Sequence, residues 1–343
     1  MSRVLVTGAA GYLGAAVAAD LTAHGHHVVA TDRSAIDAAA SVERVVGDLL
    51  DPVFVEQLFA QPYDLIVHCA AAVPLASDDP DEYDRINVGI SRAVACATPP
   101  GALLIAISSS AVWGRPHGVI DQSTPVAPFE AYGRSKLAAE RAIAQELDRR
   151  KVDYAIIRPR TIVGPGRGGI FAVLLRWIRA DLPIPLAGDG SARLSMVGIR
   201  DLIALIRYIG EQRITGIWPA VSPDVRPLKT EIAALIQREQ SKSIMVAVPA
   251  PLIRIAGWLL GRLGRSPFRP WHLGGWSSPE FLIDESWRPE GFHYRDSSAD
   301  LLDTLAVDSA TTGASPHRSA LATPTIDRIL RLARPLLALW RIR

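Results

Sequence analysis

The sequence opens with a strand-like run, a glycine-rich turn and a helical segment. Residues 3–7 (RVLVT) are apolar and β-branched, as in a buried parallel strand, and an Ala-rich stretch to about residue 24 predicts a helix. The turn between them contains Gly8, Gly11 and Gly14. Glycines at such a turn let the backbone approach a pyrophosphate, which the amides at the helix N-terminus would bind. This unit predicts a dinucleotide-binding domain.

Strand and helix segments continue to alternate along the chain. Further candidate strands lie at residues 27–31, 44–46, 65–68 and 103–107. This alternation predicts a Rossmann-type doubly wound parallel sheet, an α/β fold that binds its ligands at the carboxyl ends of the strands. We expect the dinucleotide-binding domain at residues 1–165, with residues 195–215 returning to it. A smaller C-terminal substrate-binding domain is expected at residues 166–303.

The second predicted strand ends at an acidic residue, Asp32, followed by Arg33. A carboxylate at this point is placed to accept hydrogen bonds from the adenosine ribose hydroxyls, and it would repel a 2′-phosphate. Arg33 favours a phosphorylated ribose instead. We predict NAD as the cofactor, with Asp32 and Arg33 beside its ribose.

Tyr132 and Lys136 are spaced four residues apart, which on a helix places both side chains on one face. A fixed ammonium one turn away favours the phenolate and lowers the Tyr pKa toward the working pH. The spacing alone is common on solvated helices. A serine-rich strand end, Ser108–Ser110, precedes it and falls at the ligand edge of the predicted sheet.

Taken together, these patterns resemble the extended short-chain dehydrogenase/reductase family, the NAD-dependent epimerase/dehydratase group. The resemblance rests on Thr7–Gly14, Asp32, Asp48-Leu49, His68–Ala71, Asn87, Ser109–Gly114, Tyr132–Lys136, Arg158-Pro159, Gly164-Pro165, Gly188–Gly190, Arg193 and Asp201. It implies that Tyr132 is the general acid/base, that Lys136 binds the nicotinamide ribose and lowers the Tyr pKa, and that Ser109 hydrogen-bonds the reacting oxygen. Arg158 can be structural or functional.

The resemblance also implies a homodimer and a set of residues beside the cofactor. The cofactor set comprises Gly8, Gly11, Tyr12, Leu13, Gly14, Asp32, Arg33, Asp48, Leu49, Ala70, Ala71, Asn87, Tyr132, Lys136 and Pro159.

On the substrate side the sequence departs from the nucleotide-sugar members of the family. Thr161 and Val163 replace an Asn and an aromatic residue of the Arg-Pro-x-Asn-Val-Tyr-Gly-Pro pattern. We predict substrate contacts from Ser110, Thr161, Arg167 and Arg193. The two arginines are suited to hold phosphate bidentately, or they belong to salt-bridged loops.

The implied chemistry is hydride transfer between a secondary alcohol and the nicotinamide. Dehydratases of the family carry an acidic pair directly after the catalytic Ser or Thr, where this chain has Ser110 and Ala111. We favour an NAD-dependent epimerase acting on a nucleotide sugar by transient oxidation to a ketone. A net dehydrogenase of an apolar or steroid-like alcohol is the alternative, and a non-catalytic NAD(H)-binding regulator is the second.

Composition bounds the partners and the compartment. The formal charge of +2 gives no reason to expect nucleic acid. Cys69 and Cys96 fit neither a metal site nor a disulfide framework. With no signal-peptide pattern and no apolar run of membrane-spanning length, we expect a cytoplasmic enzyme without a metal.

The C-terminal stretch has a different composition. Residues 304–324 are rich in Ala, Ser, Thr and Pro and predict a flexible linker. Residues 325–343 combine a Leu/Ile/Trp stripe with five arginines, which predicts a basic amphipathic tail helix. Such a helix is suited to peripheral contact with an anionic membrane, and equally to packing on its own domain or a second subunit.

Overall fold

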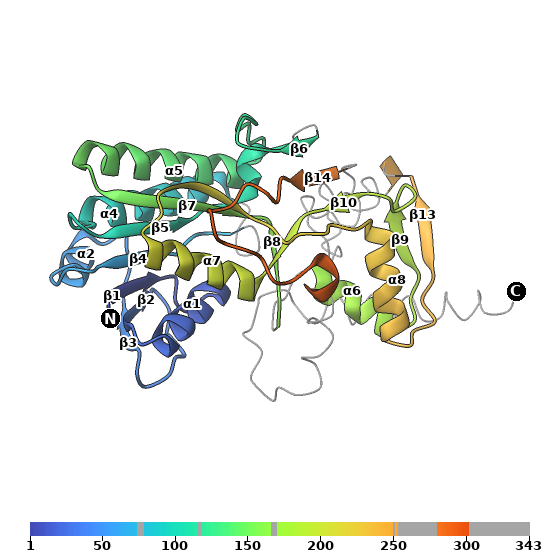
Figure 1. Cartoon of the computed structure of the whole chain (residues 1–343), viewed down its shortest axis with the longest axis horizontal. Coiled ribbons are helices and arrows are strands. Elements are labelled where there is room, and N and C mark those ends of the chain that lie inside the picture. Colours follow the sequence, from blue (N-terminus) through green and yellow to red (C-terminus); the bar gives the residue numbers. More distant parts are fainter. Residues whose placement is uncertain (74–78, 116–117, 166–169, 250, 253–279, 302–343) are drawn as a thin grey trace, which may run out of the picture. The chain divides into compact units, whose positions relative to one another are not determined.

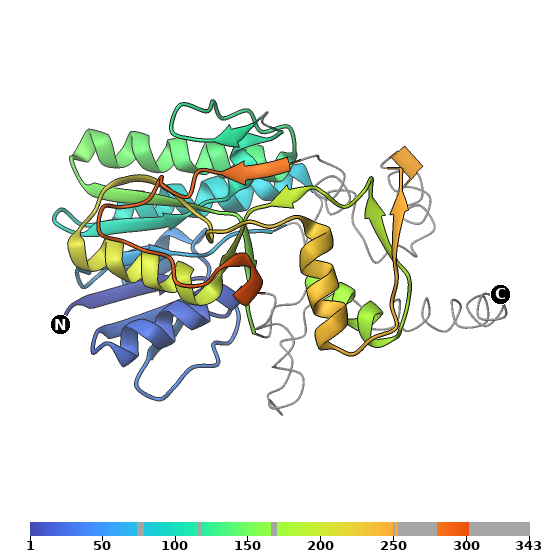
Figure 2. The ribbon, with the colours of Figure 1, turned by 45° about the vertical axis from the view of Figure 1, so that its right-hand side comes forward.

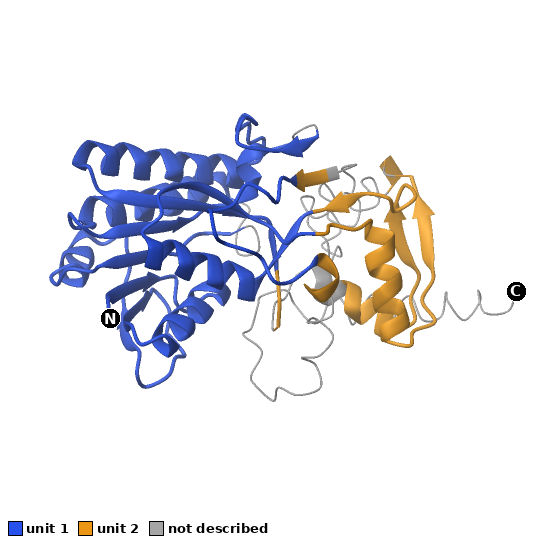
Figure 3. Cartoon of the chain, in the orientation of Figure 1, with its two compact units in different colours: residues 1–162, 195–223, 283–297 blue, residues 163–194, 224–282, 298–343 orange. Residues whose placement is uncertain are grey.

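The computed structural model describes residues 1–73, 79–115, 118–165, 170–249, 251–252 and 280–301 (Figure 1). The chain divides into two compact units (Figure 3). Unit 1 comprises residues 1–162, 195–223 and 283–297, and unit 2 the remainder. The predicted substrate contact Arg167, the predicted linker and the predicted tail helix lie outside the described residues. No helix among the described residues is long and apolar enough to cross a membrane.

Unit 1 is built on a seven-stranded sheet in which every neighbouring pair is parallel. In sheet order the strands are β12 (Gly216–Ala220), β7 (Asp153–Pro159), β5 (Leu103–Ile107), β4 (Leu65–His68), β1 (Arg3–Thr7), β2 (His27–Asp32) and β3 (Glu43–Val46). The order reverses direction at β1 and β4, as in a doubly wound fold. The predicted fold class is confirmed.

Helices cover both faces of this sheet (Figures 1 and 2). They are α1 (Tyr12–Ala23), α2 (Pro52–Leu58), α3 (Pro80–Tyr83), α4 (Gly89–Ala97), α5 (Ala131–Arg150) and α7 (Ile199–Gln212), with a π-helical turn at Asp84–Val88 and a 3₁₀ turn at Ser110–Trp113. Side chains alternate across the strands, so Val4 packs with Leu21 of α1 and Leu205 of α7, while Leu5 packs on the opposite face with the α4 and α5 residues. Two apolar layers therefore hold the sheet rigid beneath its ligand edge.

Residues 283–297, predicted to lie in the second domain, pack with unit 1 instead. The Asp201 carboxylate at the start of α7 accepts hydrogen bonds from the amides of Arg295 (3.1 Å) and Asp296 (2.9 Å). Tyr208 donates to the carbonyl of Glu290 at 2.8 Å. Since these bonds join segments more than 80 residues apart in an irregular stretch, local sequence pattern does not reveal them.

Unit 2 contains α6 (Ile170–Arg179), α8 (Leu228–Arg238) and the parallel pair β9 (Ile184–Ala187) and β13 (Met245–Val248). The Arg179 guanidinium binds the Glu239 carboxylate through Nε at 2.6 Å, which ties α6 to the end of α8. The remaining short strands are β6 (Val119–Ile120), β8 (Thr161–Val163), β10 (Arg193–Leu194), β11 (Met196–Gly198) and β14 (Glu280–Ile283). A substrate-binding role for this unit stays a prediction.

Candidate active site

The glycine turn after β1 is packed so tightly that two of its residues tolerate no side chain. Gly8 has a φ of +70°, and a Cβ there would lie 2.6 Å from the amide nitrogen of Ala70. A Cβ at Gly14 would lie 2.2 Å from the carbonyl oxygen of Gly8. Gly11 precedes α1, and no side chain caps that helix. The backbone at the start of α1 is thus arranged as a phosphate-binding turn requires.

Asp32 lies at the end of β2 and is tied to this turn. One carboxylate oxygen accepts from the amide of Ala10 at 3.1 Å and the other from the amide of Ser34 at 2.9 Å. Each oxygen keeps lone pairs for further donors, as ribose hydroxyls would supply. Arg33 beside it is exposed.

We expect the wild-type protein to bind NAD(H) more tightly than NADP(H), because a 2′-phosphate would meet the Asp32 carboxylate. Asp32→Ala should weaken NAD(H) binding and reduce the preference for NAD(H) over NADP(H), as measured by fluorescence titration with both reduced cofactors. Asp37→Ala, which removes an exposed acid from the same loop, is the control. Tighter binding of NADPH to the wild type would contradict this assignment.

Three buried side chains are hydrogen-bonded in series at the end of β4. Thr7 Oγ1 lies 2.8 Å from His68 Nδ1, and His68 Nε2 lies 3.2 Å from Ser91 Oγ. Burial, with a smaller effect of the Lys136 charge, lowers the pKa of His68 to about 3, so the ring is neutral. Thr7 Oγ1 also accepts from the amide of Ala70 at 3.2 Å, which fixes the backbone of a predicted cofactor contact.

Lys136 projects from α5 toward the end of β5. Its Nζ donates to the carbonyl oxygen of Ile107 at 2.6 Å, and the side chain is 6% exposed. Burial lowers the pKa of Lys136 to about 8, against the opposing effects of Glu140 and Cys69. Tyr132, one turn earlier on α5, is half-buried, and its ring contacts that of Tyr83 with centroids 5.8 Å apart.

Gly133 lets the start of α5 approach residues Ser109–Trp113, which we call the serine turn. A Cβ at this position would lie 2.6 Å from the carbonyl oxygen of Ala111. Ser109 accepts a hydrogen bond from the amide of Ala111 at 3.2 Å and is half-buried. That bond uses an oxygen lone pair, so the Ser109 proton can still be donated to a substrate oxygen. Ser110, its neighbour, is buried, and its predicted substrate contact stays a prediction.

Asn87 lies in the π-helical turn and joins two parts of the site. Its Oδ1 accepts from the amide of Ala72 at 2.7 Å, and its Nδ2 donates to the carbonyl of Ala72 (3.2 Å) and to Ser135 Oγ (2.9 Å). Both amide hydrogens therefore bind the protein, which fixes the loop after β4 against α5. Its predicted contact with the cofactor remains open to test.

The carboxyl end of β7 carries one charged residue that the sequence patterns do not single out. Arg160 follows Pro159 and precedes Thr161, and its amide donates to the carbonyl of Ala220 at 3.2 Å. Burial lowers the pKa of Arg160 to about 10. Of the two arginines predicted to contact substrate, Arg193 is an exposed residue of β10 in unit 2, and Arg167 lies outside the described residues.

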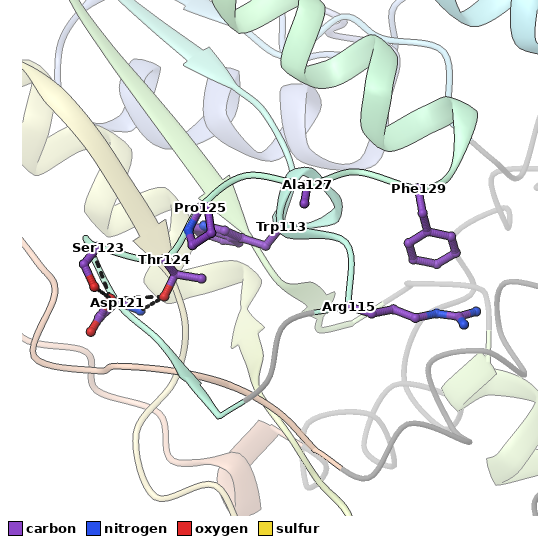
Figure 4. A pocket seen from close by; sticks show the side chains of 8 residues that line it. All are labelled: Trp113, Arg115, Asp121, Ser123, Thr124, Pro125, Ala127 and Phe129. Atoms are coloured by element: carbon purple, nitrogen blue, oxygen red, sulfur yellow. Dashed lines mark hydrogen bonds between the residues drawn. The ribbon is translucent and has the colours of Figure 1, made fainter.

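A cavity of about 650 Å³ opens on the loop between the serine turn and α5 (Figure 4). The Arg115 guanidinium lies 4.3 Å from the centroid of the Phe129 ring at its border. It is lined by Trp113, Arg115, Asp121, Ser123, Thr124, Pro125, Ala127 and Phe129. This lining includes neither Tyr132 nor Lys136.

Comparison with known proteins places this arrangement in a family. Residues 4–217, which include Ser109, Tyr132 and Lys136, match the NAD dependent epimerase/dehydratase family. The chain belongs to this family. It is therefore an NAD-dependent enzyme of the epimerase and oxidoreductase type, as the sequence resemblance implies.

The proteins similar to this chain carry names of different activities. A UDP-glucose 4-epimerase of Mycolicibacterium smegmatis is 28% identical over 259 residues, which cover 68% of this chain and 82% of that protein. Sterol demethylase protein B of Methylococcus capsulatus is 34% identical over 171 residues, 47% of this chain and 52% of its own length. The UDP-glucuronic acid 4-epimerase of Bacillus cereus, solved with NAD, shares the fold at 19% identity and a TM-score of 0.69, covering 88% of this chain and 97% of that one.

The residues present fit NAD, the cofactor of the family. Gly8 and Gly14 leave room for the pyrophosphate turn, and the Asp32 carboxylate faces the same turn through Ala10. Lys136 supplies a buried ammonium at the end of β5. Across the ligand edge of one sheet, Asp32 after β2, the glycine turn after β1 and Lys136 at β5 follow the order of adenosine ribose, pyrophosphate and nicotinamide ribose in a dinucleotide.

Proposed function

We propose that this enzyme epimerises a secondary alcohol of a nucleotide sugar by transient oxidation to a ketone. The observation that carries this proposal is the placement of Tyr132 and Lys136 one turn apart on α5, a side of the helix that we call the catalytic face. Lys136 is buried and fixed to the Ile107 carbonyl, Tyr132 lies one turn away, and Gly133 brings both to the Ser109 turn. The UDP-glucose 4-epimerase among the similar proteins, 82% of which this chain covers, supports the substrate class.

The mechanism assigns one task to each side chain. Tyr132 takes the proton from the substrate hydroxyl, and its phenolate is stabilised by the Lys136 ammonium. Ser109 donates a hydrogen bond to the same substrate oxygen. Bound NAD supplies the hydride acceptor. If the ketone turns in the site and is reduced on its other face, Tyr132 returns the proton and the configuration is inverted.

The residues after Ser109 argue against elimination chemistry. Loss of water from a sugar needs a further acid and base beside the ketone. Ser110 and Ala111 follow Ser109, Ser110 is buried, and neither is a carboxylic acid. This favours epimerisation over dehydration.

A panel of UDP-glucose, UDP-glucuronic acid and other nucleotide sugars tests the substrate class. We expect one of them to be converted to its epimer without added NAD and without a net change in nicotinamide absorbance. Mass spectrometry of small molecules retained by the gently purified protein identifies the bound substrate and cofactor independently. Oxidation of the sugar with stoichiometric release of NADH would contradict epimerisation.

Two observations bear on a second candidate, a net dehydrogenase of an apolar or steroid-like alcohol. Sterol demethylase protein B is 34% identical over about half of each chain, an identity close to the 35% of a UDP-glucose 4-epimerase over a similar length. Thr161 and Val163, the first and last residues of β8, also replace the Asn and the aromatic residue of nucleotide-sugar enzymes. NADH release with a sterol alcohol and no turnover of nucleotide sugars would favour this candidate.

The basic tail at residues 325–343 gives a further testable expectation. Five arginines near an anionic bilayer contribute about 1 kcal/mol each, in addition to burial of the Leu/Ile/Trp stripe. We expect the full chain to co-sediment with phosphatidylserine-containing liposomes at low salt and a chain truncated after Leu305 to remain in the supernatant. Equal, salt-insensitive recovery of both in the supernatant would show that the tail packs on protein instead.

A further inference from the structure

A buried ion pair of an arginine and a glutamate is joined by a serine hydroxyl, and the serine and the glutamate lie close in sequence to Ser109 and Lys136. The Arg158 guanidinium on β7 binds the Glu140 carboxylate on α5 through two parallel bonds, Nε to Oε1 at 3.0 Å and Nη2 to Oε2 at 2.7 Å. The hydroxyl of Ser108 donates to the same Oε1. Glu140 is 5% exposed and Arg158 is 6% exposed. We call Ser108, Glu140 and Arg158 the rear cluster.

The rear cluster holds the strand end that carries Ser109. Ser108 directly precedes Ser109, and its amide donates to the Ile157 carbonyl at 2.8 Å. Arg158 also lies over the ring of Trp113, 5.0 Å from the centroid, at the end of the serine turn. The turn is therefore attached to the rear cluster both before and after Ser109. Since misplacement of a reacting group by about 1 Å can cost 10²-fold in rate, these attachments bear on catalysis.

The rear cluster also acts on Lys136 through charge. Glu140 follows Lys136 by four residues on α5, and its carboxylate raises the pKa of Lys136 against the larger lowering by burial. The other titratable groups around Lys136 are Tyr132 on the same helix and Cys69 and His68 at the end of β4. Arg158 reaches the same carboxylate from β7.

We propose that the rear cluster is a positioning element of the reaction, holding the Ser109 turn and the Lys136 ammonium in their reacting arrangement. This role rests on the proposed function, since it assigns Ser109, Tyr132 and Lys136 the chemistry. None of the three rear-cluster residues needs to touch substrate or cofactor. Their contribution is expected in kcat, with little change in KM or NAD affinity.

A purely stabilising role is the competing explanation, and unit 2 offers a matched control. Arg226 binds Glu231 through Nε to Oε1 at 3.0 Å and Nη2 to Oε2 at 2.8 Å, and Ser298 donates to Oε1 of Glu231 at 2.8 Å. The hydrogen bonds join Arg, Glu and Ser in the same way and Glu231 is 2% exposed, but the Arg226 side chain is 40% exposed where that of Arg158 is 8% exposed. This cluster contains no residue of the catalytic face. A purely stabilising role would lower the melting temperature in either cluster and leave kcat of the folded protein unchanged.

The test compares Ser108→Ala and Glu140→Gln with Ser298→Ala and Glu231→Gln in the full-length enzyme. We expect kcat to fall by about tenfold for Ser108→Ala and about 10²-fold for Glu140→Gln, measured at a temperature at which every variant is folded. The control variants should keep wild-type kcat. Since Glu140→Gln leaves Arg158 buried without its counter-charge, the double variant Glu140→Gln/Arg158→Gln provides a second, charge-neutral measurement that should show the same loss in kcat.

The pH profile separates positioning from stability. The Glu140 carboxylate raises the pKa of Lys136, so its removal should lower that pKa. In Glu140→Gln the fall of kcat on the alkaline side of the pH profile should therefore begin at lower pH. In Glu231→Gln it should stay where it is in the wild type. Wild-type kcat and an unmoved limb in folded Ser108→Ala and Glu140→Gln would overturn the proposal. The ratio of variant kcat to wild-type kcat is measured with whichever alcohol the wild type oxidises. If the wild type does not turn over nucleotide sugars, that result contradicts the proposed function and leaves this test intact.

Discussion

Replacing Tyr132 with Phe is expected to lower kcat by about 10²- to 10⁴-fold, the usual contribution of general acid/base catalysis. The substitution removes only the hydroxyl and keeps the ring that contacts Tyr83. NAD binding should therefore stay close to that of the wild type. Single-turnover measurement of hydride transfer, with fluorescence titration of NADH, separates the two effects.

A hydroxyl deletion elsewhere in unit 1 serves as the control. Tyr154 lies on β7, and its hydroxyl is 3.4 Å from the Asp148 carboxylate, apart from the catalytic face. Tyr154→Phe should leave kcat unchanged. Wild-type turnover by Tyr132→Phe would show that another group transfers the proton.

Replacing Lys136 with Ala should reduce both turnover and NAD affinity. The ammonium is buried, is held by the Ile107 carbonyl, and is assigned two tasks, binding the nicotinamide ribose and stabilising the Tyr132 phenolate. We expect a loss in kcat at least as large as for Tyr132→Phe, and weaker NADH binding by fluorescence titration. Lys242→Ala, which removes an exposed side chain, is the control. Unchanged NADH affinity in Lys136→Ala would contradict the ribose contact.

The same residue predicts a pH dependence in the wild type. Burial lowers the pKa of Lys136 to about 8, so the ammonium is present below that pH and is lost as the pH rises through it. Turnover should therefore fall above a pH of about 8. A profile that stays flat well above this pH would show that catalysis does not need the charge.

The motifs at the ligand edge of the sheet could be predicted because each is formed by residues only a few positions apart in the sequence. The glycine turn, the acid at the end of β2 and the spacing of Tyr132 and Lys136 follow from strand and helix geometry alone. Asn87 was singled out by the sequence as a cofactor contact, which stays a prediction. Its partners Ala72 and Ser135 were not, because they come from separate segments.

The rear cluster shows why the supporting residues escape sequence reasoning. Glu140 lies on the same helical face as Lys136, but its pairing with Arg158 depends on how α5 packs on β7. The role of Gly133 likewise depends on a contact with Ala111, 22 residues earlier, that exists only once α5 has docked. Residues 283–297 join unit 1 through the buried Asp201 carboxylate, a long-range interaction without a local pattern.

The central claim is that this enzyme removes a hydride from its substrate and returns the same hydride to the other face. It is tested most directly with a nucleotide sugar deuterated at the reacting carbon, incubated with enzyme and no added cofactor. We predict that the epimer keeps the deuterium and that no NADH is released. Loss of the label to solvent, or stoichiometric release of deuterated NADH with the ketone as product, would contradict this account.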